Sequence, residues 1–113
     1  MHSFSFKIIH KDKKTQAKTG EIYTSHGIIR TPAFVPVGSG ASIKTLTPQE
    51  IKDCNIDVFF VNTYHMIFRP GIDTVNKMGG LQKFMNWNGP IMTDSGGFQA
   101  FSLGEFGPRN NLI

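Results

Sequence analysis

The sequence predicts an α/β protein in which an antiparallel β layer comes first and helices and strands then alternate. Residues 3–9 alternate apolar and polar side chains, a pattern typical of a strand with one buried face. Residues 57–61 and 90–93 are short apolar runs, and a helix-like stretch precedes each of them. The order helix, strand, helix, strand indicates βα units that build a parallel sheet.

The antiparallel layer is predicted to lie within residues 1–40. In its first strand Phe4, Phe6 and Ile8 share one face, which we expect to be buried. The lysine-rich stretch 11–18 then predicts a solvated hairpin loop. Contact with phosphate is an alternative interpretation of the same lysines.

Two further β segments complete this layer. Residues 21–24 predict a second strand, and residues 25–27 predict a turn. The segment 28–37 contains Pro32 and Pro36, which cannot donate a backbone hydrogen bond. These two prolines confine the segment to a sheet edge or to an irregular extended path.

The first helix is predicted to begin at a capping box. Thr47 can cap the helix, Pro48 suits its first position, and Glu50 completes the box. We expect this helix to end near Asn55. The run 57–61 that follows is almost wholly apolar, which is typical of a strand buried on both faces.

A second helix and a second buried strand follow. The helix is predicted over residues 72–78, and the two glycines at 79–80 end it. A further helical turn is predicted over residues 81–85. The Gly-Pro break at 89–90 then introduces the apolar strand 90–93.

Length and composition limit the class of protein. The chain has 113 residues, of which 39% are hydrophobic, and this suits one small domain. Its net charge of +4 is mildly basic and does not by itself indicate nucleic-acid binding. The single cysteine, Cys54, rules out an internal disulfide, and we expect a buried thiol. No apolar run approaches the roughly 18 residues of a membrane span, so a cytoplasmic protein without membrane contact is expected.

Polar residues follow both apolar strands of the predicted parallel sheet. The first strand runs into residues 62–65 (NTYH), and the second runs into residues 94–97 (DSGG). Parallel strands of an α/β unit have their carboxyl ends on one side, where such folds place their sites. The sequence therefore predicts that Asn62 and Asp94 face one pocket.

Residues 93–99 (TDSGGFQ) are the stretch most suited to chemistry. Asp94 brings a charge, and the glycines let the backbone approach a ligand closely. Phe98 can cover a flat ligand, and Gln99 offers both a donor and an acceptor. Two alternatives remain open for these residue types, an ordinary turn capped by the carboxylate and a backbone nest that binds an anion. Outside this stretch, Trp87 is interpreted as a packing residue.

Residues 93–99 closely resemble the signature of the tRNA-guanine transglycosylases, also called queuine tRNA-ribosyltransferases. Residues 61–71 (VNTYHMIFRPG) and 31–38 (TPAFVPVG) match two further motifs of that family in the same order, and the resemblance covers about residues 20–103. It implies a TIM-type (β/α)8 barrel whose N-terminal antiparallel sheet covers one end. A barrel of this type needs about 250 residues, so this chain would be its truncated N-terminal portion.

The same resemblance divides the chain into one partial domain with three segments. Residues 1–40 would form the antiparallel layer, residues 41–105 the first βα units of the barrel, and residues 106–113 an atypical tail. The tail looks unlike the family, which suggests a truncated or frameshifted reading frame.

The resemblance also implies a reaction. In that family, guanine at the wobble position of a tRNA anticodon is exchanged for queuine or its precursor. The partners are therefore tRNA and a purine-like base, and the full-length form contains a homodimer contact. Asp94 would be the catalytic proton acceptor and would bind the base. The other substrate-binding residues carried over from the motifs are Ser95, Gly96, Gly97, Phe98 and Asn62.

Several parts of the family pattern have no counterpart here. The nucleophilic aspartate lies far downstream in the family, and its structural zinc site needs three cysteines and a histidine. One cysteine cannot supply that site, so we expect no metal and no cofactor in this chain and no activity from the chain alone. The alternative function is that of a truncated, non-catalytic relative that binds RNA or a partner subunit.

Overall fold

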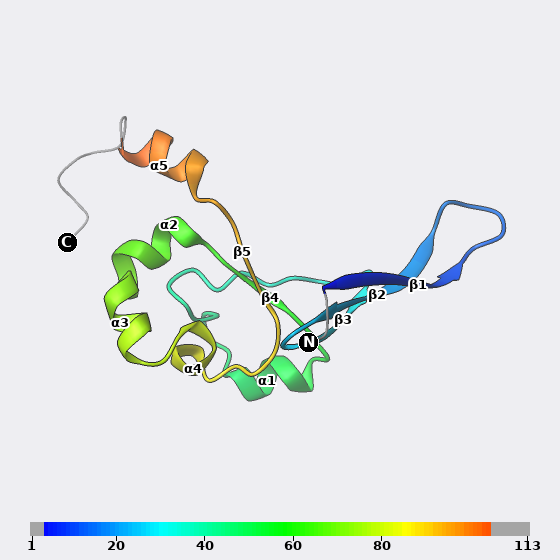
Figure 1. Cartoon of the computed structure of the whole chain (residues 1–113), viewed down its shortest axis with the longest axis horizontal. Helices are drawn as coiled ribbons and strands as arrows, with labels where there is room; N and C mark the ends of the chain where they lie inside the picture. The colour runs from blue at the N-terminus through cyan, green and yellow to red at the C-terminus, as the bar shows by residue number, and fades with distance from the viewer. Residues whose placement is uncertain (1–3, 105–113) are drawn as a thin grey trace.

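A computed structural model describes residues 4–104, with the backbone alone for residues 101–104. It is a mixed α/β structure with a three-stranded antiparallel sheet and a two-stranded parallel sheet. Its principal extents are 55 × 31 × 31 Å. The long axis arises because a β-hairpin projects from one side of the helical part (Figure 1). The predicted tail, residues 106–113, lies outside the described residues.

The antiparallel layer that the sequence predicted is a three-stranded sheet. Its strands are β1 (Ser5–Lys11), β2 (Lys18–Thr24) and β3 (Gly27–Thr31), hydrogen-bonded in the order β1-β2-β3. Phe6 lies opposite Ile22, and a bulge between Ile8 and His10 shifts the register toward the hairpin loop. The ring of Phe6 also lies across Gly20, which has no Cβ to obstruct it.

The buried face predicted for β1 is wrong for this chain. Phe4, Phe6 and Ile8 are 78%, 51% and 38% exposed. Alternation creates an apolar face, but burial also requires a second layer against that face. Among residues 4–104 no element covers most of it.

The segment after β3 takes the irregular extended path that its prolines predicted. The N–H of Phe60 donates to the carbonyl of Pro36 at 2.8 Å, and the N–H of Gly38 donates to the carbonyl of Phe60 at 2.7 Å. Val37 therefore forms a single parallel bridge with Phe60. This bridge adds an edge to the parallel sheet.

An ion pair joins the antiparallel layer to the segment that precedes the parallel sheet. The guanidinium of Arg30 in β3 donates to both carboxylate oxygens of Asp57, at 2.7 and 2.8 Å. The backbone N–H of Arg30 also donates to Asp57, at 3.1 Å. The pKa of the Asp57 carboxyl is lowered, chiefly by the hydrogen bond from the Arg30 side chain. A bidentate pair of this kind fixes orientation as well as distance.

Helix α1 (Pro48–Asp53) begins at the predicted capping box. The N–H of Glu50 donates to Thr47 Oγ1 at 3.3 Å, and the N–H of Thr47 donates to Glu50 Oε2 at 2.7 Å. The prediction of a buried thiol at Cys54 is wrong, because Cys54 is exposed. It lies at the C-cap of α1, whereas the buried residue of that helix is Ile51.

The parallel sheet consists of β4 (Phe59–Val61) and β5 (Ile91–Thr93), as the two apolar runs predicted. Phe59 pairs with Ile91, and Val61 pairs with Thr93. Strand β4 lies in the core, and Phe59 is 1% exposed. Strand β5 was also predicted to be buried, but Met92 is 38% exposed, because no described element packs on the far side of β5.

Four helical segments connect β4 to β5, and a fifth follows β5. They are α2 (Thr63–Met66), the kinked segment η1 (Ile67–Gly71), whose Arg69 has an extended backbone, α3 (Ile72–Lys77), α4 (Leu81–Met85) and α5 (Gly97–Gly104). The helical positions of α3 and α4 were predicted, whereas α2 and α5 were not. Among the described residues no helix is long and apolar enough to cross a membrane.

The core lies where the parallel sheet meets the first helix and the last turn before β5. Trp87 is 2% exposed and packs against Phe59, with ring centroids 4.8 Å apart. Its indole Nε1 donates to the carbonyl of Pro90 at 3.1 Å. Trp87 is thus the packing residue that the sequence predicted, and it anchors the start of β5. The buried cluster around it comprises Ala41, Ile51, Phe59, Val61, Met85 and Trp87.

Candidate functional site

The two parallel strands bring Asn62 and Asp94 together at their carboxyl ends. Val61 is paired with Thr93 in the parallel register. The residues that follow them, Asn62 and Asp94, therefore lie next to each other where the two strands end. Asn62 Nδ2 donates to Asp94 Oδ2 at 3.4 Å, a long bond between two half-buried side chains. The structure therefore places these two residues side by side, and a pocket that both face stays a prediction. In addition, Ser39 Oγ donates to Asn62 Oδ1 at 3.3 Å.

Thr63 holds Asp94 more closely than Asn62 does. The backbone N–H of Thr63 donates to Asp94 Oδ1 at 2.9 Å, and the Thr63 hydroxyl donates to the Asp94 carbonyl at 2.5 Å. Thr63 is the first residue of α2, and the first N–H groups of a helix have no partner inside the helix. Sequence reasoning missed this residue because it did not predict that α2 begins directly after β4.

These donors stabilise the ionised form of Asp94. The pKa of the Asp94 carboxyl is lowered from its ordinary value, chiefly by the backbone N–H of Thr63. Partial desolvation raises it, and the side chains of Asn62 and Thr63 lower it further. Hydrogen bonds to a carboxylate favour the charged form. Asp94 is therefore an anion at neutral pH, held in place by neutral donors.

Gly96 is the residue of the predicted motif with the clearest geometric requirement. Its φ of +67° lies in the left-handed region, which favours glycine. A Cβ at this position would lie 3.1 Å from the backbone nitrogen of Tyr64. The turn after β5 and the first turn of α2 thus approach closely because residue 96 has no side chain. Tyr64 is buried at this contact, as a packing residue.

The remaining motif residues lie around the start of α5. Ser95 Oγ accepts a hydrogen bond from the N–H of Gly97 at 3.3 Å. That bond engages one of the N–H groups that an anion-binding nest would need. Phe98 projects from the first turn of α5 and is 80% exposed, so its ring packs on little of the described structure. Asn62, Asp94 and Gly96 are therefore closely placed, whereas Phe98 is open to solvent.

The described residues offer no metal site of ordinary composition. Within residues 4–104 no three His, Cys, Asp or Glu side chains gather closely enough to hold an ion. The whole chain has one cysteine, whereas the zinc site that the family resemblance implies needs three. The residues present do not fit that zinc site.

A carboxylate and an amide at the carboxyl ends of neighbouring parallel strands place the chain among α/β proteins whose sites lie at that edge. The sequence model of the family described as queuine tRNA-ribosyltransferase matches residues 12–111. The chain belongs to this family. The matched range extends past both ends of the stretch 20–103 that the three motifs had indicated.

Curated relatives share about half of their aligned residues with this chain. It is 55% identical over 98 residues to the queuine tRNA-ribosyltransferase of Desulforamulus reducens, covering 87% of this chain and 26% of that protein. It is 53% identical over 100 residues to that of Enterococcus faecalis, covering 88% of this chain and 26% of the relative. The chain thus spans about a quarter of the length of these relatives.

Proposed function

We propose that this chain supplies the N-terminal part of a tRNA-guanine transglycosylase. The reaction is exchange of the wobble guanine of a tRNA anticodon for queuine or its precursor. The main support is that Asp94 is ionised at the carboxyl end of β5 and accepts hydrogen bonds from Thr63 and Asn62. Membership of the queuine tRNA-ribosyltransferase family supports the reaction class.

The proposed architecture of the complete enzyme is a TIM-type (β/α)8 barrel. Strands β4 and β5 would be its first two strands, and β1–β3 would cover one end. The parallel register of β4 and β5 and the exposed apolar side chain of Met92 beside the open edge of β5 support this arrangement. In that layout residues 1–40 form the covering layer, residues 41–105 the first βα units, and residues 106–113 a tail.

Asp94 is proposed to be the proton acceptor. A purine that bonds to the ribose carbon through a ring nitrogen must lose the proton of that nitrogen, and a carboxylate at hydrogen-bonding distance can accept it. The lowered pKa keeps Asp94 deprotonated, but it also means that the carboxylate has a low affinity for a proton. Substrate must therefore weaken the bonds from Thr63 and Asn62, which raises the pKa of Asp94 toward that of a useful base.

The residues around Asp94 are proposed to form the base pocket. Ser95, Gly96 and Gly97 would shape its wall, since the turn at Gly96 brings backbone close to the ligand. The exposed ring of Phe98 is free to stack on a flat heterocycle, which is a common way to hold an unpaired base. Asn62 would lie near the ribose.

The other parts of the reaction are proposed to come from outside this chain. They are the nucleophilic aspartate, the zinc-binding cysteines and the homodimer contact of the family's full-length form. The proposed partners are tRNA and a purine-like base. The proposed location is the cytoplasm, because tRNA is found there.

The test places the chain in a complete enzyme. A chimera would join residues 1–103 of this chain to the rest of the Desulforamulus reducens relative, and incorporation of labelled guanine into tRNA would be measured. We expect Asp94→Asn to lower the rate at least about 100-fold, in the range for loss of a general base. The matched control is Asp73→Asn, an exposed carboxylate in α3, which should leave exchange unchanged.

Two outcomes of this test would contradict the proposal. Near-normal exchange in the Asp94→Asn chimera would remove Asp94 from the reaction. A chimera that binds tRNA yet exchanges no base with Asp94 intact would favour the alternative, a non-catalytic relative that binds RNA or a partner subunit.

A further inference from the structure

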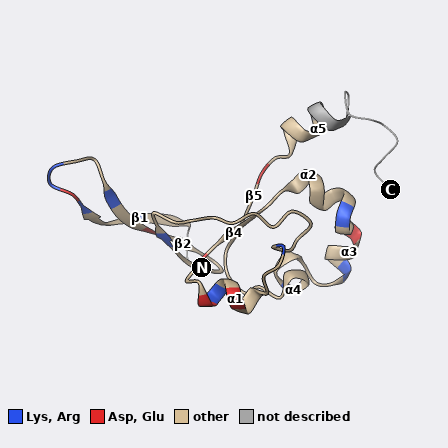
Figure 2. Cartoon of the chain, turned by 180° about the vertical axis from the view of Figure 1, so that it is seen from behind, with Lys and Arg blue, Asp and Glu red and all other residues tan. Residues whose placement is uncertain are grey.

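The tip of the β1–β2 hairpin concentrates positive charge far from the candidate site. The stretch 11–18 contains four lysines and a single acidic residue, Asp12, in a chain whose whole net charge is +4. All residues of this stretch are exposed, and the hairpin projects from the body of the molecule (Figure 2). Among residues 4–104 none of these ammonium groups forms an ion pair. The four lysines are Lys11, Lys13, Lys14 and Lys18.

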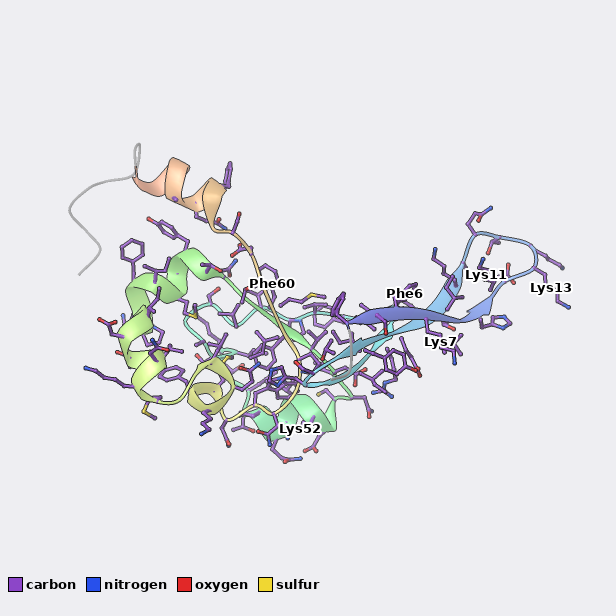
Figure 3. The ribbon with its side chains drawn as sticks, in the orientation of Figure 1. Phe6, Lys7, Lys11, Lys13, Lys52 and Phe60 are labelled. Carbon is purple, nitrogen blue, oxygen red and sulfur yellow. The ribbon has the colours of Figure 1, made fainter. Side chains whose placement is uncertain are left out.

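The single carboxylate of the tip is engaged by its own loop. Asp12 Oδ2 accepts from the N–H groups of Lys14 and Thr15 at 3.1 and 2.7 Å, and from the Thr15 hydroxyl at 2.8 Å. The N–H of Asp12 also donates to the carbonyl of Ala17 at 2.9 Å and closes the loop. Asp12 therefore orders the backbone of the tip. Figure 3 shows Lys13 directed outward at the bend, away from the body.

The last pair of the β1–β2 ladder sets two like charges against each other. Lys11 lies directly opposite Lys18 in the antiparallel register. Like charges in opposed positions destabilise a hairpin, whereas an opposite pair would stabilise it. The arrangement costs stability in the free protein, and a bound polyanion would reverse that cost.

We propose that this tip binds the phosphate backbone of tRNA. The proposal rests on the proposed function, which makes tRNA the substrate, and assigns to the hairpin a separate contact with it. Lysines act as point charges on phosphate and supply affinity that does not depend on sequence. A membrane surface fits less well, because residues 11–18 contain no aromatic or large aliphatic side chain that would enter a lipid interface.

Binding of fluorescently labelled tRNA to the chain, measured by anisotropy at several salt concentrations, tests the proposal. The test variant is Lys13→Gln/Lys14→Gln, and the matched control is Lys77→Gln/Lys83→Gln, which removes two exposed charges from α3 and α4. Each phosphate contact contributes about 0.7–0.9 to the slope of log affinity against log salt. The hairpin variant should lower that slope by about 1.5 and weaken binding at low salt roughly tenfold, whereas the control should change neither.

A second variant separates RNA binding from the stability of the hairpin. Lys18→Glu places a carboxylate opposite Lys11, so it should raise the melting temperature while it weakens tRNA binding. A purely structural role for these lysines predicts that stability and binding change in the same direction, and that result would overturn the proposal.

Failure of this proposal is distinguishable from failure of the proposed function. Equal losses from the hairpin and control variants, or no loss from either, would overturn a tRNA contact at the tip. Absence of tRNA binding by the chain, while the chimera described above still exchanges base, would overturn it as well. Each of these results leaves the test of Asp94 unaffected.

Discussion

Thr63 and Asp94 are joined by two hydrogen bonds that link the start of α2 to the end of β5. The backbone N–H of Thr63 donates to the carboxylate at 2.9 Å, and its hydroxyl donates to the Asp94 carbonyl at 2.5 Å. The first bond positions the carboxylate of Asp94, and the second positions its backbone carbonyl. Asp94 is thus oriented by the first residue of the helix that follows the neighbouring parallel strand.

Replacement of Thr63 should change the pKa of Asp94 in a defined direction. Thr63→Val removes the hydroxyl but keeps the backbone N–H, which is the largest cause of the lowered pKa. The pKa of Asp94 should therefore rise but stay below its ordinary value. Thr63→Ser keeps both donors and should leave the pKa unchanged. NMR titration of the Asp94 carboxyl carbon measures the change, and identical titrations for Thr63→Val and the unaltered chain would contradict the account.

Asp94 should also make the stability of the protein depend on pH. A carboxyl whose pKa is lower in the folded state stabilises the fold above its unfolded pKa of about 3.9, and this stabilisation is lost as the pH falls through the folded pKa. Asp94→Asn removes the titrating group. As the pH falls below 5, the free energy of unfolding of this variant should therefore decrease less than that of the unaltered chain. Urea unfolding at a series of pH values measures this difference. A parallel pH dependence for the two proteins would contradict it.

The glycine pair after Ser95 offers a matched test of the turn. Gly96→Ala combines a left-handed backbone with a Cβ 3.1 Å from the Tyr64 nitrogen. We expect a loss of stability of about 1–2 kcal/mol from the backbone alone. Gly97→Ala is the control, since a Cβ there meets only Ser95 Oγ, at an ordinary 3.5 Å. Thermal unfolding of both variants measures the difference, and equal losses would refute a special role for residue 96.

Trp87 should contribute more to stability than any side chain at the site. It is 2% exposed, packs against Phe59 with the two rings tilted, and donates to the carbonyl of Pro90. Trp87→Ala should cost about 3–5 kcal/mol, and the milder Trp87→Phe should lose mainly the bond to Pro90. Chemical denaturation measures both values. A loss below about 1 kcal/mol for Trp87→Ala would show that this core does not fix the start of β5.

Local signals in the sequence predicted most of the fold. The capping box at Thr47 predicted α1, and two apolar runs predicted the parallel strands. Exposure was harder to predict, because the face of Phe6 and the outer side of β5 require neighbouring layers that no local pattern specifies. Helix α2 was missed because it has only four residues, too few for a helical repeat, and Asn62 at its N-cap makes no side-chain cap hydrogen bond. Helix α5 was missed because it begins at Gly97, directly after a glycine-rich turn.

At the candidate site, the sequence predicted which strand ends meet but not how they are held. Polar residues after two buried strands were enough to place Asn62 beside Asp94. The stronger contact comes from the backbone N–H of Thr63. Because every residue except proline has a backbone N–H, the residue type at this position does not reveal such a contact. The motif glycines pointed to a close approach, and the structure identifies its partner as Tyr64 at Gly96.

The position of bound guanine would show whether Asp94 contacts the base. A crystal structure of the chimera with guanine would be determined, and the distance from the base to the Asp94 carboxylate would be measured. We expect a ring nitrogen within about 3.2 Å of that carboxylate, and the ring of Phe98 over the face of the base. Guanine bound elsewhere, with Asp94 still bonded to Thr63 as in the unliganded chain, would contradict it.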